Sequence, residues 1–359
     1  MKKYNRKLIL ENGTEIPGYS FGAPGERMLE LVFNTSMVGY QEIISDPSYT
    51  DQAVVMTYPL IGNYGMSDED YESKSPSIGA LVVREYNDDP SSWRSDEPLD
   101  SVMRRYNIAG ISGVDTRRLT RIIREIGSCK AIVTDMVNDS KLSLERLKNT
   151  ELPRDQVSRV TAKESYISDV CDNKSSYNVV AIDCGMKSNI VRELNAHGCR
   201  VTVVPYDTTP ETIEGYKPDG IFISNGPGDP TDAVPVIETV RRLKGRYPMF
   251  GICLGHQIIS LAYGASTYKL KFGHRGGNHP VMNLETGKIE MTSQNHSYAV
   301  DRSSLAGTGL KVTHVNLLDD TVEGLSCEED RVFSVQYHPE SAPGPCDSEY
   351  LFDRFVNLM

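Results

Sequence analysis

The sequence predicts an α/β protein of two domains, with an open, mostly parallel sheet in its C-terminal half and a β-rich domain before it. Strand-like and helix-like segments alternate from about residue 178 onward, which is typical of βαβ units in a parallel sheet. Short strand-like runs dominate residues 1–150 instead. The length of 359 residues is large for one domain and sufficient for two.

The C-terminal domain is expected over 178–359. Its strands are predicted at 178–185, 200–207, 219–225 and 248–252, and its helices at 187–198, 234–245 and 254–264. In the first of these helices Ile190, Val191 and Leu194 share one face, and Gly198 suits the C-terminal cap. Shorter strand-like runs follow at 287–294, 310–318 and 331–339, before a final helix at 347–359.

The N-terminal domain, residues 1–150, has a different pattern. Asn12-Gly13 predicts the turn of a hairpin within residues 6–22. Strand-like segments continue at 30–49 and 53–65, and the clearest helix is expected at 115–128. Residues 151–177 are polar and weakly patterned, so we predict a linker there. The apolar face of the 115–128 helix would be formed by Leu119, Ile122, Ile123 and Ile126.

The composition excludes several classes of function. The formal net charge is −11 and the isoelectric point about 5.2, whereas a nucleic-acid-binding protein needs a basic surface. No apolar run reaches about 18 residues, the length of a membrane-spanning helix. The apolar segment 8–10 is too short for the core of a signal peptide. We therefore expect a cytoplasmic protein that binds neither nucleic acid nor membranes.

The cysteines do not form a recognisable framework. Their number is odd, their spacing is wide, and no C-x-x-C pair occurs, which excludes a disulfide scaffold and a zinc ribbon. We expect most of them to be small buried residues or incidental surface residues, and we expect no metal site. The seven are Cys129, Cys171, Cys184, Cys199, Cys253, Cys327 and Cys346.

One cysteine, Cys253, stands between two glycines in Gly-Ile-Cys-Leu-Gly, where an expected strand ends and an expected helix begins. Small residues at a sharp strand-to-helix turn allow the side chain to project from the sheet as a nucleophile. The helix N-terminus favours a thiolate and offers N–H groups to an oxyanion. A buried structural cysteine fits the same pattern about equally well, so the motif alone leaves both interpretations open.

A nucleophilic cysteine needs a base and a group that orients the base. His338 and Glu340 follow an apolar strand, and the proline between them fixes the backbone, so both side chains are expected on one side. The Gly-Pro-Gly turn at 226–228 ends another strand, where ligands bind in open α/β sheets. Plain turns explain each motif separately. Three such motifs at three strand ends favour a triad of Cys253, His338 and Glu340.

Together, the motifs SNGPGDP, GICLGHQ and HPE resemble those of the class I glutamine amidotransferases, from about residue 178 to the C-terminus. The resemblance implies a flavodoxin-like sheet and hydrolysis of glutamine to glutamate and ammonia. Cys253 would attack the side-chain amide and form a γ-glutamyl thioester. His338 would pass a proton to the leaving ammonia and then activate water. Glu340 would orient the His338 ring. Backbone N–H groups near Gly228 and Leu254 would form the oxyanion hole.

The N-terminal half is similar to the carbamoyl-phosphate synthase small-chain family. The matching segments are FNTSMVGYQEIISDPSYTDQ, YPLIGNYG and GISGVDTRRLTRIIRE, joined later by KFGHRGGNHPV and SQNHSYAVD. The resemblance spans nearly the whole chain and implies the glutamine-hydrolysing subunit. The family usually has Asn-His-Gly-Phe at 295–298, where this chain has Asn-His-Ser-Tyr, and backbone contacts would tolerate that change. The implied glutamine contacts are Ser48, Gly226, Gly228, Leu254, Gln257, Asn295, Ser297 and Tyr298.

The same resemblance implies a partner, the synthase large chain. The sequence contains no G-x-x-x-x-G-K-[ST] loop, and Gly273–Gly277 is more typical of a loop than of a phosphate site. We therefore expect no cofactor in this chain, ATP and magnesium chemistry on the large chain, and ammonia passing to it through an interior channel. A basic cluster is our hypothetical docking site, although a solvated helix face explains any single arginine. The cluster comprises Arg104, Arg105, Arg117, Arg118, Arg121, Arg124 and Lys130.

Three alternatives compete with this interpretation. In the first alternative, the chain is the amidotransferase subunit of another synthase, such as one that makes anthranilate or GMP, but the extra N-terminal domain argues against that. In the second alternative, the chain is a catalytically silent regulator of the large chain, which the intact triad argues against. In the third alternative, the chain is a free-standing γ-glutamyl hydrolase with no partner. The sequence does not decide between arginine and pyrimidine synthesis.

Overall fold

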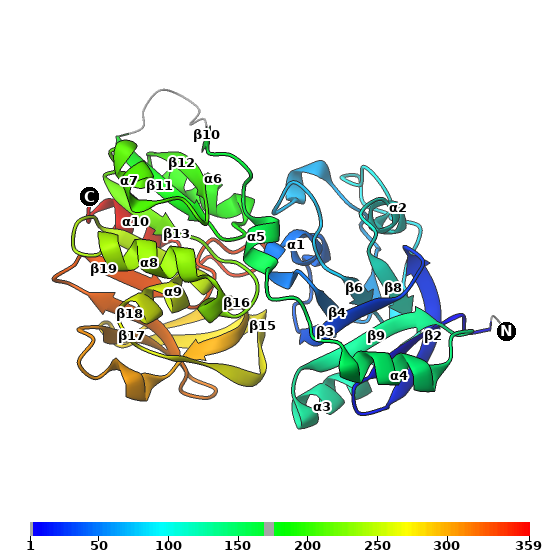
Figure 1. The fold of residues 1–359 in the computed structure, drawn as a ribbon. Coiled ribbons are helices and arrows are strands. Elements are labelled where there is room, and N and C mark those ends of the chain that lie inside the picture. The colour runs from blue at the N-terminus through cyan, green and yellow to red at the C-terminus, as the bar shows by residue number, and fades with distance from the viewer. Residues whose placement is uncertain (1–2, 169–175) are drawn as a thin grey trace. The chain divides into compact units, whose positions relative to one another are not determined.

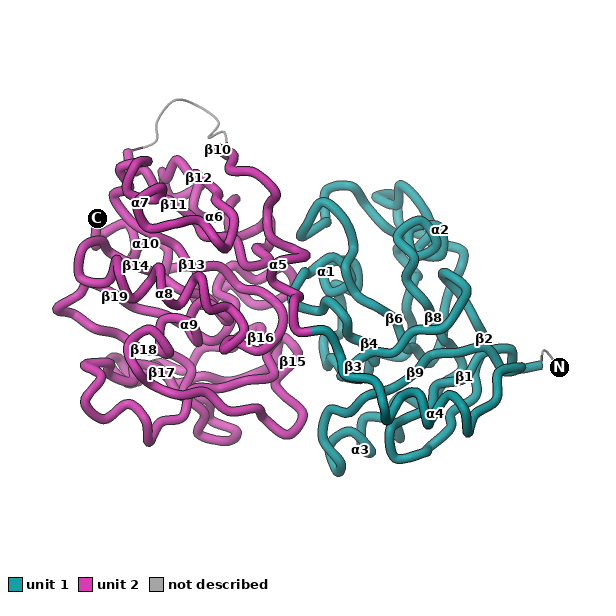
Figure 2. The backbone as a smooth tube through the Cα atoms, viewed as in Figure 1, with its two compact units in different colours: residues 1–153 teal, residues 154–359 magenta. Residues whose placement is uncertain are grey.

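The structure, a computed structural model, describes residues 3–168 and 176–359. The chain divides into two compact units, Met1–Pro153 and Arg154–Met359 (Figure 2). Of the cysteines in the described residues, Cys129 is partly buried, Cys346 is exposed, and the others are buried and free. Cys171 lies outside the described residues.

The segment that we expected to be a linker, residues 151–177, contains regular structure in its described part. Helix α5 (Gln156–Val160) and strand β10 (Tyr166–Ser168) lie there, and both belong to the C-terminal unit. Strand β10 pairs antiparallel with β12 (Cys199–Pro205). Thr161 also donates a hydrogen bond through its hydroxyl to the Asp183 carbonyl oxygen at 2.5 Å. Long-range pairing therefore fixes a segment whose local pattern is weak.

The N-terminal unit contains a closed barrel of strands with helices packed around it (Figure 1). The barrel order is β1-β2-β8-β6-β4-β3-β9. The β3/β4, β4/β6 and β6/β8 pairs are parallel, and the remaining pairs are antiparallel. The strands are β1 (Arg6–Leu10), β2 (Glu15–Gly22), β3 (Arg27–Asn34), β4 (Gln52–Met56), β6 (Ala80–Val82), β8 (Ala109–Ser112) and β9 (Cys129–Asp135).

Two local predictions in this unit are confirmed. The hairpin forms between β1 and β2, and Gly13 adopts the positive φ of 87° that its turn requires. Helix α3 (Thr116–Ile126) begins after Asp115, whose side chain accepts a hydrogen bond from the Arg118 N–H, and ends at Gly127. The other elements are α1 (Tyr40–Ser45), α2 (Leu99–Arg105), α4 (Ser140–Asn149), the 3₁₀ turns η1 (Pro47–Tyr49) and η2 (Asp68–Asp70), and the short pair β5 (Leu60–Ile61) and β7 (Glu85–Tyr86).

The strand-like segment predicted over residues 30–49 is confirmed only as far as Asn34. Strand β3 ends at Asn34, and helix α1 follows after Gly39, whose φ of 83° turns the chain out of the extended conformation. Ile43 and Ile44 lie about one helical turn after Tyr40, and all three belong to the apolar core of the unit. Their spacing fits a helix, which the β-branched composition of the segment obscured.

The C-terminal unit is built on a sheet whose described strands have the order β10-β12-β11-β13-β14-β19-β18-β17-β15-β16. Its centre, β12-β11-β13-β14-β19, is parallel. The chain enters at β11 and moves first to β12 and then back past β11 to β13, so the topological switch point lies between β11 and β13. The other strands are β11 (Tyr177–Asp183), β13 (Gly220–Ile223), β14 (Met249–Ile252), β15 (Thr267–Asn283), β16 (Ile289–Val300), β17 (Lys311–Asn316), β18 (Val322–Cys327) and β19 (Val332–Val335).

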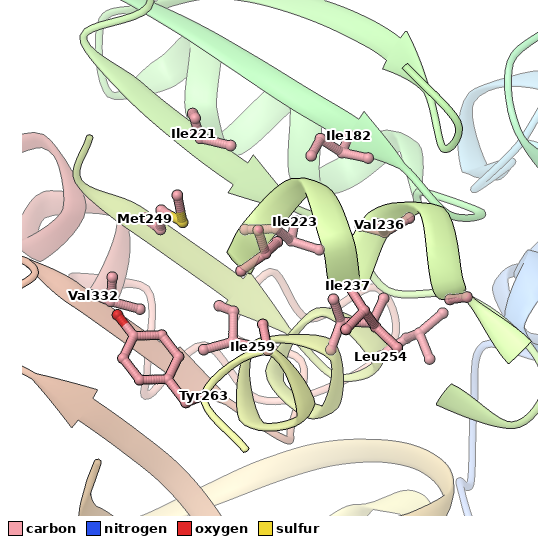
Figure 3. Packing of buried hydrophobic residues seen from close by; sticks show 14 of the residues in the cluster. Ile182, Ile221, Ile223, Val236, Ile237, Met249, Leu254, Ile259, Tyr263 and Val332 are labelled. Atoms are coloured by element: carbon pink, nitrogen blue, oxygen red, sulfur yellow. The ribbon is translucent and has the colours of Figure 1, made fainter. Parts of the chain in front are cut away.

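Apolar layers cover both faces of the parallel centre. Val180 and Ile182 of β11 join the cluster that contains α8 (Val234–Leu243) and α9 (Leu254–Ala262). Figure 3 shows Ile223, Ile237 and Leu254 within this cluster. The alternate residues of β11 face a second cluster, with α6 (Ser188–Ala196) and α10 (Tyr350–Val356). In this unit the sequence analysis also missed the short helix α7 (Pro210–Gly215), as it missed α2 and α4 in the N-terminal unit.

Gly273–Gly277, expected to be a loop, lies inside strand β15. The pairing of β15 with β16 slips at two places, between Lys269 and His274 and between Gly276 and His279. These bulges explain why glycines recur in the segment without producing a turn. A Cβ at Gly273 would lie 2.4 Å from the carbonyl oxygen of His296, so the two strands approach too closely for a side chain.

Replacing Gly255 with alanine should destabilise the C-terminal unit by about 1–3 kcal/mol. The added Cβ would lie 2.2 Å from the carbonyl oxygen of Ile223 on β13. Gly215 of α7 is the matched control, because a Cβ there meets nothing within 4 Å. Gly215→Ala should be neutral or slightly stabilising. Urea unfolding of both variants measures the difference, and equal stabilities would contradict the close packing of α9 on β13.

Candidate functional site

Cys253 occupies the corner between β14 and α9. Its φ of 53° and ψ of −103° are unfavourable for a residue with a Cβ, and the side chain is only 2% exposed. The Cys253 N–H donates to the Val335 carbonyl oxygen at 2.9 Å, which continues the β14/β19 pairing into the corner. Strain of about 1–3 kcal/mol is maintained at such positions only when surrounding structure requires it.

The glycines around Cys253 make that corner possible. A Cβ at Gly251 would lie 2.8 Å from the backbone of Gly255, and a Cβ at Gly255 would meet the β13 backbone. The strand and the helix can therefore approach only if both residues lack side chains. The spacing Gly-x-Cys-x-Gly thus reflects a steric requirement of the strand-to-helix turn.

His338 lies beyond the end of β19, where its N–H donates to the Ser293 carbonyl oxygen at 2.9 Å. Its Nδ1 lies 2.7 Å from Oε1 of Glu340, so Nε2 is left as the ring atom available to the Cys253 thiol. Burial lowers the pKa of His338, but the charge of Glu340, the adjacent Cys253 side chain and the hydrogen bond with Glu340 outweigh burial and raise the pKa to about 10. Within the described residues, Nε2 itself has no hydrogen-bond partner of normal geometry.

A buried lysine completes the charge arrangement. Lys187 Nζ lies 3.0 Å from Oε1 of Glu340 and donates to the Ser341 carbonyl oxygen at 2.6 Å. Both members of the ion pair are almost completely buried, with side chains 4% and 0% exposed. Burial raises the pKa of Glu340, whereas the charges of Lys187 and His338 lower it, and the result is a pKa of about 2. Glu340 therefore stays ionised beside the imidazole.

The sequence analysis missed Lys187. Asp183 ends β11, and its Oδ1 accepts from the N–H groups of Gly185 and Met186 at 2.8 and 2.7 Å. Asn225, just after β13, accepts from the Lys187 N–H through Oδ1 at 3.1 Å. Two polar residues at the ends of β11 and β13 thus hold the lysine at the switch point. The sequence did offer one signal for Lys187, since the lysine comes shortly after a strand of buried residues and a glycine.

Several predicted glutamine contacts lie beside Cys253. The thiol donates to the Asn295 carbonyl oxygen at 3.5 Å. Gln257, on α9, donates through Nε2 to the carbonyl oxygen of Tyr298 at 2.8 Å and to Oε1 of Gln336 at 2.9 Å. Its amide nitrogen therefore anchors strand β16 to α9. Ser297 accepts a hydrogen bond through Oγ from Arg275, which also belongs to the β15/β16 pair.

The remaining predicted contacts are backbone positions or lie in the other unit. A Cβ at Gly226 would lie 2.2 Å from the carbonyl oxygen of Cys184, so only glycine fits there. Gly228 has a φ of 90° and lines a hollow with Arg154 and Gln156. Leu254 is buried as the first residue of α9, where N–H groups lack intrahelical partners. Ser48 is buried in the N-terminal unit on η1, and its role remains a prediction.

The basic cluster divides into two groups. Arg104 and Arg105 form ion pairs with Asp100 and Glu97, and Lys130 lies 3.7 Å from a Glu11 carboxylate oxygen, so these three are partnered within the unit. The other four lie exposed on α3, and within the described residues none forms an ion pair. Three of them line a shallow hollow along α3. They are Arg117, Arg118 and Arg121.

Two family models match the chain, one in each half. The model of class-I glutamine amidotransferases matches residues 180–358, and that of the carbamoyl-phosphate synthase small chain, CPSase domain, matches residues 8–133. The C-terminal unit is therefore a class-I glutamine amidotransferase domain. A crystal structure from Thermoplasma acidophilum, described as that of a GMP synthase subunit, aligns with 51% of this chain and 93% of its own, with a TM-score of 0.45 and 21% identity, which is too distant to inform function.

Whole-chain relatives then decide the family. The carbamoyl phosphate synthase small chain of Staphylococcus epidermidis is 52% identical over 99% of this chain and 96% of its own length. The carbamoyl phosphate synthase pyrimidine-specific small chain of Bacillus subtilis is 51% identical with the same coverage. The chain belongs to the carbamoyl phosphate synthase small-chain family, and it is the glutamine amidotransferase subunit of that synthase. Within the described residues, every helix is too short or too polar to span a bilayer.

Replacing Lys187 with methionine should destabilise the unit by about 1–3 kcal/mol at neutral pH, because it removes one of the two cations that face the buried Glu340 carboxylate and takes a donor from the Ser341 carbonyl oxygen. The loss should shrink as the pH falls, since protonation of Glu340 then removes the charge that Lys187 compensates. In the wild type, the contribution of Glu340 is present above its unfolded pKa near 4.5 and is lost only as the pH falls through about 2.

The control for this variant is Arg241→Met, which removes an exposed ion pair with Glu238 and should cost about 0–1 kcal/mol. Urea unfolding at several pH values measures both variants. If Lys187→Met costs no more than Arg241→Met, the buried pair does not stabilise Glu340 as described.

Proposed function

We propose that Cys253, His338 and Glu340 hydrolyse glutamine, and that the ammonia released is passed to the large chain for ATP-dependent synthesis of carbamoyl phosphate from bicarbonate. The observation that carries the proposal is the position of His338. One ring nitrogen is bonded to Glu340, the other is available to Cys253, and the thiol lies at a strained strand-to-helix corner. This is the geometry of a nucleophile with an oriented acid–base group.

The first half-reaction uses the charge distribution around His338. With its pKa raised to about 10, the imidazole holds a proton at neutral pH, and Cys253 supplies the thiolate that attacks the glutamine carboxamide carbon. The free N–H groups at the start of α9 face the negative charge that develops on the amide oxygen. His338 then protonates the departing nitrogen, the C–N bond breaks, and ammonia and a γ-glutamyl thioester remain.

The second half-reaction reverses the roles. Neutral His338 takes a proton from water, the resulting hydroxide adds to the thioester carbonyl, and the C–S bond breaks. The new carboxylic acid gives its proton to solvent and leaves as glutamate, the thiolate of Cys253 is restored, and His338 is again an imidazolium. Lys187 and Glu340 remain charged throughout, so the carboxylate orients His338 without accepting its proton.

Glutamine would be held by the backbone near Gly226, Gly228 and Leu254, by Gln257, and by the strand segment Asn295–Tyr298. We place ATP and magnesium on the large chain, and we propose that Ser48 contributes from the N-terminal unit. A pyrimidine-specific relative suggests, but does not decide, which pathway uses the product.

Cys253→Ser should reduce glutamine-dependent carbamoyl phosphate synthesis by several orders of magnitude in the complex reconstituted with the large chain. Synthesis from added ammonia should be unchanged, because that reaction bypasses the thiol. The measurement compares both nitrogen donors in the same preparation. Retained glutaminase activity would refute the nucleophile assignment. Ammonia-dependent synthesis that fails equally would mean that the variant disrupts the complex and not the chemistry.

We also propose that the exposed arginines of α3 dock the large chain. Reversing Arg117 and Arg118 to glutamate should weaken the affinity for the large chain, measured by calorimetry or co-purification. Lys141 and Lys148, exposed on α4, give a matched double reversal that should leave the affinity unchanged. Equal affinity of the two double variants would exclude α3 as the docking surface.

A further inference from the structure

Three side chains from different strands bring metal-ligating atoms together in the antiparallel part of the C-terminal sheet. His274 lies on β15, His296 on β16 and Glu323 on β18. One ligand atom from each lies within 4.8 Å of the others. The residues are 7%, 5% and 0% exposed. Imidazoles and a carboxylate converging in a buried space are the ligand types of a zinc site.

The outer hydrogen bonds of both imidazoles fix which nitrogen faces inward. His296 Nδ1 lies 2.7 Å from the carbonyl oxygen of Tyr298, which can only accept, so the proton is on Nδ1 and the lone pair is on Nε2. His274 Nε2 lies 2.8 Å from Oδ2 of Asp319, which places a proton there and leaves Nδ1 directed inward. Metal-bound histidines characteristically donate their outer N–H to a carboxylate or a carbonyl in this way.

Gln294, on β16, places a further acceptor between the two rings. Its amide nitrogen donates to Oγ1 of Thr292 at 3.2 Å and to Oε2 of Glu323 at 3.1 Å, which sets the orientation of the amide. Its Oε1 therefore lies 3.0 Å from both His274 Nδ1 and His296 Nε2. The contact with His296 joins two acceptors. A positive charge beside both atoms relieves that repulsion, and either a bound cation or a doubly protonated His274 between Asp319 and Glu323 would supply it.

A second proton on His296 would make this imidazole positively charged, but that arrangement is unfavourable here. His274 would also need to be protonated to donate to Gln294, and the two ring centroids are 4.9 Å apart. Two cations at that separation in a buried site repel strongly. A rotated Gln294 amide would donate to both rings, but its oxygen would then face Glu323, whose carboxylate would have to carry a proton.

We propose that this cluster binds one divalent cation, zinc by its donor set, through His274 Nδ1, His296 Nε2, the Glu323 carboxylate and Gln294 Oε1. His274 Nδ1 lies 3.7 Å from Oε1 of Glu323 and 3.0 Å from Gln294 Oε1. Tetrahedral ligands about 2.1 Å from zinc lie about 3.4 Å apart, so small side-chain movements complete the site. The carboxylates of Glu323 and Asp319 offset the charge of the ion.

The ion would act structurally. Strands β15, β16 and β18 meet at it, and the Tyr298 carbonyl oxygen that accepts from His296 also accepts from Gln257. The same strand carries Asn295, whose carbonyl oxygen accepts from the Cys253 thiol. The bound ion would therefore fix the part of β16 that borders the candidate active site. This reverses our expectation from the sequence that the chain holds no metal.

The test measures zinc by plasma mass spectrometry in the full chain, expressed in zinc-supplemented medium without a histidine tag and then desalted. We expect about one zinc per chain in the wild type and in Cys253→Ser, which excludes binding by the catalytic thiol. Glu323→Gln, which preserves shape and removes charge, and His296→Gln should each lose most of the metal. His197→Asn should retain it, because His197 lies near Glu193 and Asp353 without a second imidazole.

A wild-type chain that retains no zinc would overturn the proposal and leave two metal-free arrangements, a doubly protonated His274 or a rotated Gln294 amide with a protonated Glu323. That result does not depend on whether any variant folds. Full zinc content in Glu323→Gln and His296→Gln would also overturn it, because the ion would then be bound elsewhere. Replacement of zinc by cobalt gives a second readout, since a four-coordinate site of nitrogen and oxygen ligands produces intense visible bands in the wild type.

Discussion

The ion pair between Lys187 and Glu340 places two opposite charges in the interior, beside the switch point of the sheet. Removing charges from water is costly, and the cost is offset only when each charge is held in good geometry. Here the lysine is fixed by the turns after β11 and β13, and the carboxylate holds the His338 imidazole. The proton on His338 and the reactivity proposed for Cys253 both depend on this buried negative charge.

The sheet places the residues of this ion pair and the neighbouring site residues at one buried edge. Parallel strands end at one edge, so β11, β13, β14 and β19 deliver Lys187, Cys253 and His338 to the same place although they are far apart in the sequence. Apolar layers on both faces exclude water from this edge. The antiparallel extension of the sheet adds β16, whose carbonyl groups approach the thiol, and the proposed zinc site would hold β16 in register with β15 and β18.

Charge has a different role on the N-terminal unit. Within the described residues, the exposed arginines of α3 form no ion pair. The neighbouring basic residues that looked equivalent in the sequence, Arg104 and Arg105, are neutralised by acidic residues of their own unit. Which charges remain exposed without an ion pair therefore depends on the tertiary structure, and composition alone does not reveal this.

The sequence by itself determined the features that depend on local sterics and periodicity. These include the βαβ alternation, the hairpin at Asn12-Gly13, helix α3 and the glycine-flanked corner at Cys253, because turn geometry and side-chain spacing are properties of short segments. Only the tertiary structure decided the rest. Lys187, the strand nature of Gly273–Gly277 and the helix within 151–177 depend on partners distant in the chain. So does the buried cluster around His296, since its ligands come from three strands and no local motif unites them.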